Sequence, residues 1–314
     1  MLPLLLAAAL AAAPVETAVE APGPYGPLKG TMLAPAGTPR ATILIVPGSG
    51  PTDRDGNSPL GVRAAPYKLL VEGLAGRGIA TVRIDKRGMF ASAGAIPDAN
   101  QVTVADYATD VHAWAKAIRA RTGAHCLWVL GHSEGALIAL AAAQDRTDLC
   151  GVILVSGGGR RLGDVIRDQL RANPANALIL PQAMAALDAL EAGRKVDTNG
   201  MNPALLPLFN PRVQGFLISL FSCDPAALIA KLRLPALIVQ GERDLQVSVG
   251  DARRLAAADP AAKLVLLPDV NHVLKTVASD ERNVNFATYA DPSLPLAPGI
   301  VEAIAGFVAP PPRR

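Results

Sequence analysis

The stretch LWVLGHSEGALIAL, residues 127–140, decides the fold class of this chain. It begins with a short apolar run typical of a buried strand and ends in Ala and Leu, which predict a helix starting almost at once. Between them lies GHSEG (131–135), a G-x-S-x-G pattern. A serine on so sharp a turn projects its Oγ above the sheet, and glycine is needed on both sides because side chains there would clash. The alternative is a glycine-rich helix entry without catalytic meaning, but the strand before it and the helix after it favour a nucleophilic Ser133.

The rest of the chain follows the pattern of a mostly parallel sheet covered by helices. Apolar runs that end in turn residues predict further strands at 41–46, 79–85, 151–159, 235–244 and 263–269. Apolar residues at helical spacing predict helices at 67–77, 103–121, 135–144 and 299–308. Half of the 314 residues are apolar, so the chain has enough material for one large α/β domain.

The strand pattern is interrupted between residues 160 and 234. This segment is rich in Ala, Leu, Asn and Pro, and its helical pieces lie near 161–172, 181–192 and 211–221. It contains no apolar run typical of a buried strand. We interpret it as a helical insertion between two core strands rather than as an independent domain.

The first 13 residues, MLPLLLAAALAAA, are apolar but too few to span a bilayer comfortably. They are followed by the polar, turn-rich PVETAVEAPGP. We interpret residues 1–20 as a secretory signal peptide, cleaved between Ala13 and Ala21, and residues 21–314 as the mature domain. The alternatives are an uncleaved membrane anchor or merely a hydrophobic start. A cleaved signal predicts a periplasmic or secreted protein with no membrane span.

Composition argues against several kinds of partner. The formal net charge is +3, from 30 basic and 27 acidic residues dispersed along the chain. Because there is no basic run to track phosphates, we expect no nucleic-acid partner. The four histidines and three cysteines lack the spacing of a zinc site, so we expect no metal and no cofactor.

Two of the cysteines, Cys126 and Cys150, each stand immediately before a predicted strand. If these strands are parallel neighbours about 4.8 Å apart, their amino-terminal ends lie side by side at a separation that a disulfide can bridge. An oxidising compartment would let the bond persist. Two reduced, buried thiols are the equally open alternative. Cys223 would remain a free thiol.

The general base is expected to be His272. A serine hydroxyl is a poor nucleophile until a base takes its proton. His112 lies within a predicted helix, and His125 precedes a strand at the far end of the sheet. The sharp turn of GHSEG, called the elbow below, is expected to direct the His132 side chain into the fold. His272 follows the last predicted strand, which places it at the same carboxyl edge as Ser133.

The carboxylate that orients His272 is expected to be Asp244, which follows the strand PALIVQG at the same edge. Asp269 is closer to the histidine in sequence but is interpreted as a turn residue, and Asp251 as part of a helix start. Serine hydrolases whose nucleophile lies in a G-x-S-x-G turn between a strand and a helix also carry their triad in the chain order Ser, Asp, His.

An oxyanion hole needs two backbone N–H groups aimed at the developing charge. One is expected from Glu134, the residue after the nucleophile. The other is expected from Ser49 in the loop PGSG (47–50), with Gly50 as the second choice. The alternative for this loop is an ordinary turn; a phosphate loop would require a lysine that the loop lacks.

Five segments carry a resemblance to a known family: PGSGPTDRDGN (47–57), DKRGMFAS (85–92), GHSEG (131–135), QGERDLQV (240–247) and NHVLK (271–275). The chain resembles the α/β-hydrolase superfamily over nearly its whole length after residue 20. More narrowly, it is similar to a bacterial esterase branch grouped with serine aminopeptidase-like (S33-type) hydrolases. The resemblance implies an eight-stranded, mostly parallel sheet, a helical cap after the sixth strand and activity on short acyl esters.

The combined prediction is a carboxylesterase-like serine hydrolase that acts on a small-molecule acyl ester without a cofactor. An aminopeptidase or an acyltransferase with the same triad is the first alternative, and a non-catalytic secreted binding protein of this fold is the second. The cap, at about 160–234, is expected to set the chain-length preference through apolar residues including Phe209, Phe216 and Phe221. It is poor in the acids that an aminopeptidase needs to hold a free ammonium.

Charged loop residues near the predicted site invite two interpretations. Asp53, Arg54 and Asp55 either bind substrate or, as is commoner for charges at a turn, pair with one another or with solvent. Asp85 and Arg87 are expected to brace the loop after strand 79–85.

Overall fold

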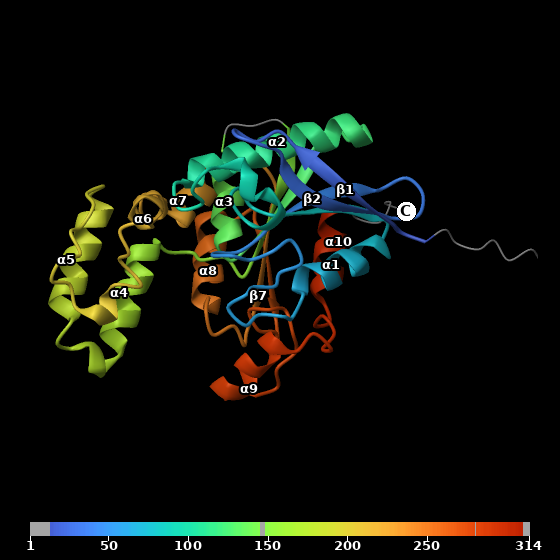
Figure 1. Ribbon diagram of the computed structural model, residues 1–314. Helices are drawn as coiled ribbons and strands as arrows, with labels where there is room; N and C mark the ends of the chain where they lie inside the picture. Colours follow the sequence, from blue (N-terminus) through green and yellow to red (C-terminus); the bar gives the residue numbers. More distant parts are fainter. Residues whose placement is uncertain (1–12, 145–147, 280, 310–314) are drawn as a thin grey trace, which may run out of the picture.

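The computed structural model describes residues 13–144, 148–279 and 281–309. Its core is an eight-stranded sheet with the strand order β1-β2-β4-β3-β5-β6-β7-β8. β2 runs antiparallel to both of its neighbours, and all the other strand pairs are parallel. Helices flank the sheet on both sides (Figure 1). The predicted eight-stranded and mostly parallel sheet is confirmed.

The strands are β1 (Val15–Ala21), β2 (Leu28–Ala34), β3 (Ala41–Val46), β4 (Ile79–Ile84), β5 (Leu127–His132), β6 (Leu149–Val155), β7 (Ala236–Gly241) and β8 (Lys263–Leu267). The α-helices are α1 (Pro66–Ala75), α2 (Val104–Thr122), α3 (Glu134–Ala142), α4 (Leu162–Ala172), α5 (Leu180–Glu191), α6 (Gln214–Phe221), α7 (Pro225–Ala230), α8 (Val249–Ala258), α9 (Arg282–Ala287) and α10 (Ile300–Val308).

The two faces of the sheet are buried against different helices. Along β3, Ile43 and Ile45 belong to a buried cluster that includes residues of α1 and α10, whereas Leu44 and Val46 belong to a second cluster that includes residues of α2, α3 and α8. Successive side chains of a strand point to opposite faces, so a strand buried on both faces is apolar throughout rather than alternating. This is why the central strands were recognisable as continuous apolar runs.

β1 and β2 were not recognised as individual strands from the sequence. β1 reads VETAVEA and pairs with β2 over its full length at the edge of the sheet. Its exposed side chains include Glu16 and Glu20, and Glu16 forms an ion pair with Arg83 of β4 (2.7 Å). An edge strand that buries only part of one face leaves a weak apolar signal.

The position of β1 bears on the predicted signal peptide. Residues 1–12 lie outside the described residues, but the predicted boundary at residue 20 falls inside β1. Within PVETAVEAPGP, described above as turn-rich, residues Val15–Ala21 form a strand. A cleavage that leaves the sheet whole must lie before Val15. Over the described ranges, no helix combines the length and the apolar content that crossing a membrane requires.

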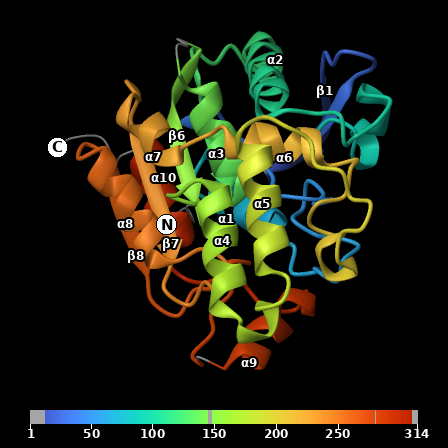
Figure 2. The same ribbon diagram turned by 90° about the vertical axis from the view of Figure 1, so that its left-hand side faces the viewer.

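The segment between β6 and β7 forms α4, α5, α6 and α7 with two short 3₁₀ turns. Figures 1 and 2 show α4 and α5 side by side, projecting from the body of the domain. The insertion has an apolar core of its own, which also contacts Leu137 of α3 and Val104 of α2.

Phe209 and Phe221 belong to that core, and they are 0% and 1% exposed. A side chain without accessible surface cannot line an open acyl pocket, so these two were wrongly assigned to one. Phe216 instead packs edge-on against the Tyr107 ring of α2, with the centroids 6.0 Å apart. All three hold the insertion together or attach it to the domain.

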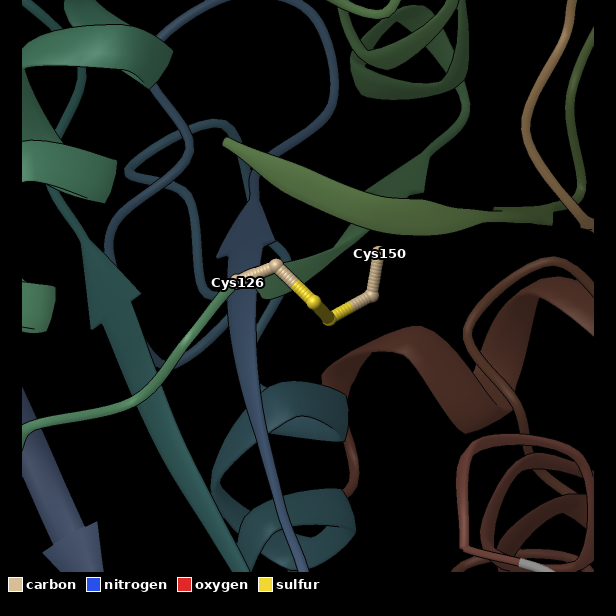
Figure 3. Close-up of a disulfide and its surroundings, with 2 residues drawn as sticks. All are labelled: Cys126 and Cys150. Carbon is tan, nitrogen blue, oxygen red and sulfur yellow. A yellow bond between two sulfur atoms is a disulfide. The ribbon is translucent and has the colours of Figure 1, made fainter. Parts of the chain in front are cut away.

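Cys126 and Cys150 are joined by a disulfide with a Cα–Cα distance of 5.2 Å. Figure 3 shows the bond spanning the amino-terminal ends of neighbouring strands, as the parallel arrangement of β5 and β6 allows. Cys223 is a free thiol. Of the two alternatives open from the sequence, the structure contains the disulfide.

Replacing both cysteines, Cys126→Ala with Cys150→Ala, should lower the free energy of unfolding by about 3 kcal/mol, because the bond closes a 24-residue separation in the unfolded chain. Catalytic constants should not change, since the bond lies at the opposite edge of the sheet from Ser133. Urea unfolding and ester hydrolysis measure the two effects. Non-reducing mass spectrometry of exported protein supplies the control: separately alkylated Cys126 and Cys150 peptides, with no linked pair, would contradict the bond.

Candidate active site

The turn between β5 and α3 holds Ser133 in a strained conformation. Its φ and ψ are 55° and −120°, a positive-φ region that non-glycine residues rarely adopt. Such a conformation costs on the order of 1–3 kcal/mol and persists only where the surroundings enforce it. Here the Ser133 N–H donates to Val155 O (2.9 Å) and its carbonyl accepts from Ala136 N–H (3.0 Å). The backbone on both sides of Ser133 is thereby held in place.

The two glycines of GHSEG are required by close backbone approach. A Cβ at position 131 would lie 2.0 Å from Gly135 O. A Cβ at position 135 would lie 2.3 Å from Val46 O, at the end of β3. The elbow is therefore tight in itself and pressed against the neighbouring strand, which explains the glycine pattern that the sequence showed.

His272 and Asp244 meet at the carboxyl edge of the sheet. Asp244 follows β7, His272 follows β8, and His272 Nδ1 lies 2.8 Å from Asp244 Oδ2. A carboxylate accepts only, so the proton is on Nδ1 and Nε2 is left with a lone pair. The Asp244 side chain has no exposed surface and the His272 side chain is 7% exposed. The pair is thus oriented for His272 to accept a proton at Nε2.

Asp244 remains ionised despite its burial. Burial alone raises the pKa of its carboxyl, but the nearby His272 charge, the hydrogen bond from its ring and the backbone N–H groups of Val247 and Gln246 outweigh this and leave the pKa below its usual value. The Val247 N–H is 2.9 Å and the Gln246 N–H 2.8 Å from Asp244 Oδ1. The hydrogen bonds also fix the carboxylate in one rotamer.

The other acids considered from the sequence have different partners. Asp269 accepts from Arg243 Nε (3.3 Å) within a turn. Asp251 lies in the first turn of α8, where Ser248 Oγ donates to it at 2.6 Å. The structure thus brings Asp244, rather than either rival, against His272.

The remaining histidines also lie where the sequence suggested. His112 is in α2, 3.2 Å from Asp148 Oδ2. His125 is exposed and precedes β5. His132 is buried, and its ring centroid is 4.7 Å from that of His272, which places His272 directly beside the elbow.

His132 links three parts of the site through a buried chain of hydrogen bonds that the sequence did not reveal. Its Nε2 lies 2.8 Å from His272 O, and because a carbonyl only accepts, Nε2 carries the proton. Its Nδ1 therefore accepts from the Tyr67 hydroxyl (2.9 Å), and that hydroxyl accepts from Gly48 N–H (3.2 Å). The chain requires a neutral His132. Burial, followed by the His272 charge, lowers its pKa to about 3.

The predicted oxyanion donors belong to two segments next to Ser133. Glu134 is the first residue of α3, so its N–H has no intrahelical acceptor. The loop that carries Ser49 follows β3, and a Cβ at Gly48 would lie 3.3 Å from Ser133 Cβ. In the sheet, β3 lies between β4 and β5. The chain passes from β3 to β4 on one side and only later forms β5 on the other side. Ligands of open α/β sheets bind outside the strand ends at such a switch point.

The charged loop residues are engaged with protein groups. The Arg54 guanidinium is paired with Asp85, and its backbone N–H also donates to that carboxylate (2.9 Å). Asp55 pairs with Arg83 (2.6 Å). Of the two interpretations, the geometry supports a structural role for this loop.

Arg87 braces the loop after β4 in the expected way. It forms ion pairs with two carboxylates of α2, Asp110 at 2.6 Å and Asp106 at 3.1 Å. In a different loop, the one after β3, the Asp53 carboxylate accepts hydrogen bonds from Asp55 N–H (2.9 Å) and Asn57 N–H (2.8 Å).

Comparison with known proteins gives consistent similarities. The serine aminopeptidase (S33) family model matches residues 60–199. Esterase EstD of Thermotoga maritima is 27% identical over 252 residues, which cover 79% of this chain. The match spans 58% of the length of that esterase.

Two solved structures share the fold at low sequence identity. Est1E of Butyrivibrio proteoclasticus, solved with bound ferulic acid, has a TM-score of 0.57 and 17% identity, and the match covers 93% of this chain and 96% of Est1E. An esterase of Pyrococcus furiosus has a TM-score of 0.53 and 18% identity, with coverage of 82% and 83%.

The buried, neutral His132 should make the protein acid-sensitive. Its folded pKa is about 3, below the ordinary 6.5, so between these values the unfolded chain binds a proton that the folded chain does not. Its contribution to stability is complete above pH 6.5 and is lost as the pH falls toward 3. Over that window His132→Gln, which can keep both hydrogen bonds, should remove up to about 1.4 kcal/mol per pH unit of dependence. Urea unfolding at several pH values measures this, and identical pH slopes in the two proteins would contradict it.

Proposed function

We propose that this chain, an α/β-hydrolase related to the esterase and serine aminopeptidase-like branch, hydrolyses carboxylic esters through an acyl-enzyme on Ser133. The observation that carries the proposal is the 2.8 Å hydrogen bond between the buried Asp244 carboxylate and His272 Nδ1. It lies at the sheet edge where the strained elbow presents Ser133. The similarity to Esterase EstD supports ester hydrolysis.

In the first half of the reaction, Ser133 Oγ attacks the ester carbonyl while His272 Nε2 takes its proton. The backbone N–H groups of Ser49 and Glu134 hold the oxyanion of the tetrahedral intermediate. Collapse breaks the bond to the alcohol, which leaves with the proton from His272. Asp244 stabilises the imidazolium that exists between these two proton transfers.

In the second half, water attacks the acyl-enzyme as His272 removes its proton. The second tetrahedral intermediate breaks down to the free acid, and His272 returns the proton to Ser133 Oγ. Each turnover consumes one ester and one water and releases one alcohol and one acid. The residues named here supply the base, the nucleophile and the oxyanion donors.

The ion pairs of the helical insertion favour an ester over a free amino terminus as substrate. Arg167 pairs with both Asp188 (2.5 Å) and Glu191 (2.6 Å), and it also lies 3.7 Å from Asp164. Asp168 pairs with Arg160 at 2.8 Å. Carboxylates already matched to arginines are poorly placed to bind a substrate ammonium, which an aminopeptidase requires. We therefore rank the aminopeptidase below the esterase.

We also propose that the insertion acts as a cap that sets the acyl-chain preference, with short chains favoured. It leaves the sheet after β6, at the same carboxyl edge as Ser133. Export to the periplasm or the exterior is proposed from the apolar amino-terminal stretch, with cleavage before Val15. The Cys126–Cys150 disulfide supports an oxidising compartment.

Removal of any triad member should abolish most of the activity. Ser133→Ala and His272→Ala should each lower kcat by on the order of 10³-fold or more, since only binding and oxyanion stabilisation remain. Asp244→Asn should be severe, whereas Asp269→Asn, a matched change in a neighbouring turn, should be mild. Hydrolysis of p-nitrophenyl butyrate measures kcat. Retention of more than a tenth of the activity by Ser133→Ala would refute the nucleophile, and a severe Asp269→Asn would refute Asp244.

Substrate class is decided by assaying p-nitrophenyl esters from acetate to palmitate beside amino-acid p-nitroanilides. We expect turnover of the shorter esters and little cleavage of the anilides. Preferential cleavage of the anilides would favour the aminopeptidase. A fluorophosphonate probe should label Ser133, and absence of labelling in folded protein would favour a binding protein without turnover.

A further inference from the structure

Lys86 is a buried lysine that the proposed mechanism does not use. It follows β4, and its side chain is 2% exposed. Its Nζ donates to Gly48 O at 2.6 Å and to Glu134 Oε1 at 2.9 Å, and it lies 5.2 Å from the centroid of the Tyr107 ring. A lysine is rarely buried so completely without a specific reason.

The two acceptors of Lys86 lie on the two segments that carry the proposed oxyanion donors. Gly48 O belongs to the peptide unit whose other end is the Ser49 N–H. A peptide unit is planar and trans, so a hydrogen bond that fixes the direction of its C=O also fixes the direction of its N–H. The other acceptor is the side chain of Glu134, whose own backbone N–H is the second donor.

Charge adds to this geometry. An ammonium on the Gly48 carbonyl polarises the peptide unit and strengthens its N–H as a donor, because linked hydrogen bonds reinforce one another. The Tyr67 hydroxyl accepts from the Gly48 N–H on the preceding peptide unit (3.2 Å). The peptide units on both sides of Gly48 are thus restrained, one through its N–H and the other through its C=O.

The Lys86–Glu134 pair is hard to explain by stability alone. Taking both charges out of water costs several kcal/mol per ion, and well-packed apolar residues of similar volume are often as stabilising as a buried pair. Methionine has nearly the length of lysine and would fill the same space. The charge therefore points to a role beyond packing.

We propose that Lys86 is a positioning residue of the oxyanion hole: its ammonium aligns the Gly48–Ser49 peptide unit and ties it to Glu134 at the start of α3. This inference rests on the proposed function. Lys86 acts through backbone groups and does not touch the substrate. Its effect therefore belongs to the transition state, where the oxyanion forms, rather than to ground-state binding.

Lys86→Met should lower kcat for p-nitrophenyl butyrate by about 10- to 100-fold and change KM by less than about threefold. Direct loss of an oxyanion donor costs about 10²- to 10³-fold, and misalignment of a retained donor should cost less. A trifluoromethyl ketone with a short alkyl chain forms a tetrahedral oxyanion adduct with an active serine. Its inhibition constant should rise in parallel with the fall in kcat/KM.

Two further variants separate positioning from stability. Lys86→Met with Glu134→Gln leaves no unpaired buried charge, so it should fold even where the single variant does not, and it should remain slow because Gly48 O still lacks its donor. Arg87→Met removes the adjacent buried cation, which contacts α2 instead. It should lower the melting temperature and leave kcat/KM within about twofold of the wild type.

The outcomes distinguish this inference from the proposed function. If the double variant recovers wild-type kcat, or if both Lys86 variants bind the trifluoromethyl ketone as the wild type does, Lys86 has no positioning role. If Arg87→Met loses as much kcat as Lys86→Met, the effect is general destabilisation and the inference is overturned. If the folded wild-type protein neither hydrolyses the ester nor reacts with a fluorophosphonate, the proposed function itself fails.

Discussion

The contact between the backbone of the elbow and the end of β3 is the constraint on which the site depends. Gly135 lies so close to Val46 O that even a methyl group would not fit. That approach lets α3 begin immediately after β5, and it holds Ser133 at a φ of 55°. It also brings the loop after β3 against Ser133, so one steric condition sets both the nucleophile and the segment opposite it. The strain at Ser133 is offset by the packing of α3 against the sheet and against α2.

Buried polar groups then connect the separate loops of the sheet edge. The chain from Gly48 through Tyr67 and His132 reaches the backbone of His272. The Asp244 carboxylate holds the ring of the same histidine from the other side. Each buried group is costly unless its partners are present, so loops from β3, β5, β7 and β8 are stable together in one arrangement. The arrangement of the site is therefore maintained by the free-energy cost of leaving these buried polar groups without hydrogen-bond partners.

Three charged pairs lie close to the site and connect its loops. Arg54 with Asp85, Arg87 with Asp110, and Lys86 with Glu134 join the loop after β4 to three different elements. This pairing supports the proposal of a neutral acyl ester as substrate. It also shows how the conspicuous DKRG segment serves the site without contributing a reacting group.

The sequence by itself determined the fold class, the elbow and the order of the sheet-edge residues. Strands buried on both faces are continuous apolar runs, and parallel strands place their carboxyl ends together, so Ser133, Asp244 and His272 could be placed at one edge from local pattern alone. The strand β1 was not predicted because an edge strand is only half buried. The predicted signal boundary at residue 20 therefore falls inside this strand. Only the tertiary structure decided which partners meet. Residues far apart in the chain meet in the Tyr67–His132 hydrogen bond, the Lys86 contacts, the Cys126–Cys150 bond and the apolar core that buries Phe209. Such contacts leave no periodic trace in the sequence, because their distances are set by how whole strands and helices pack.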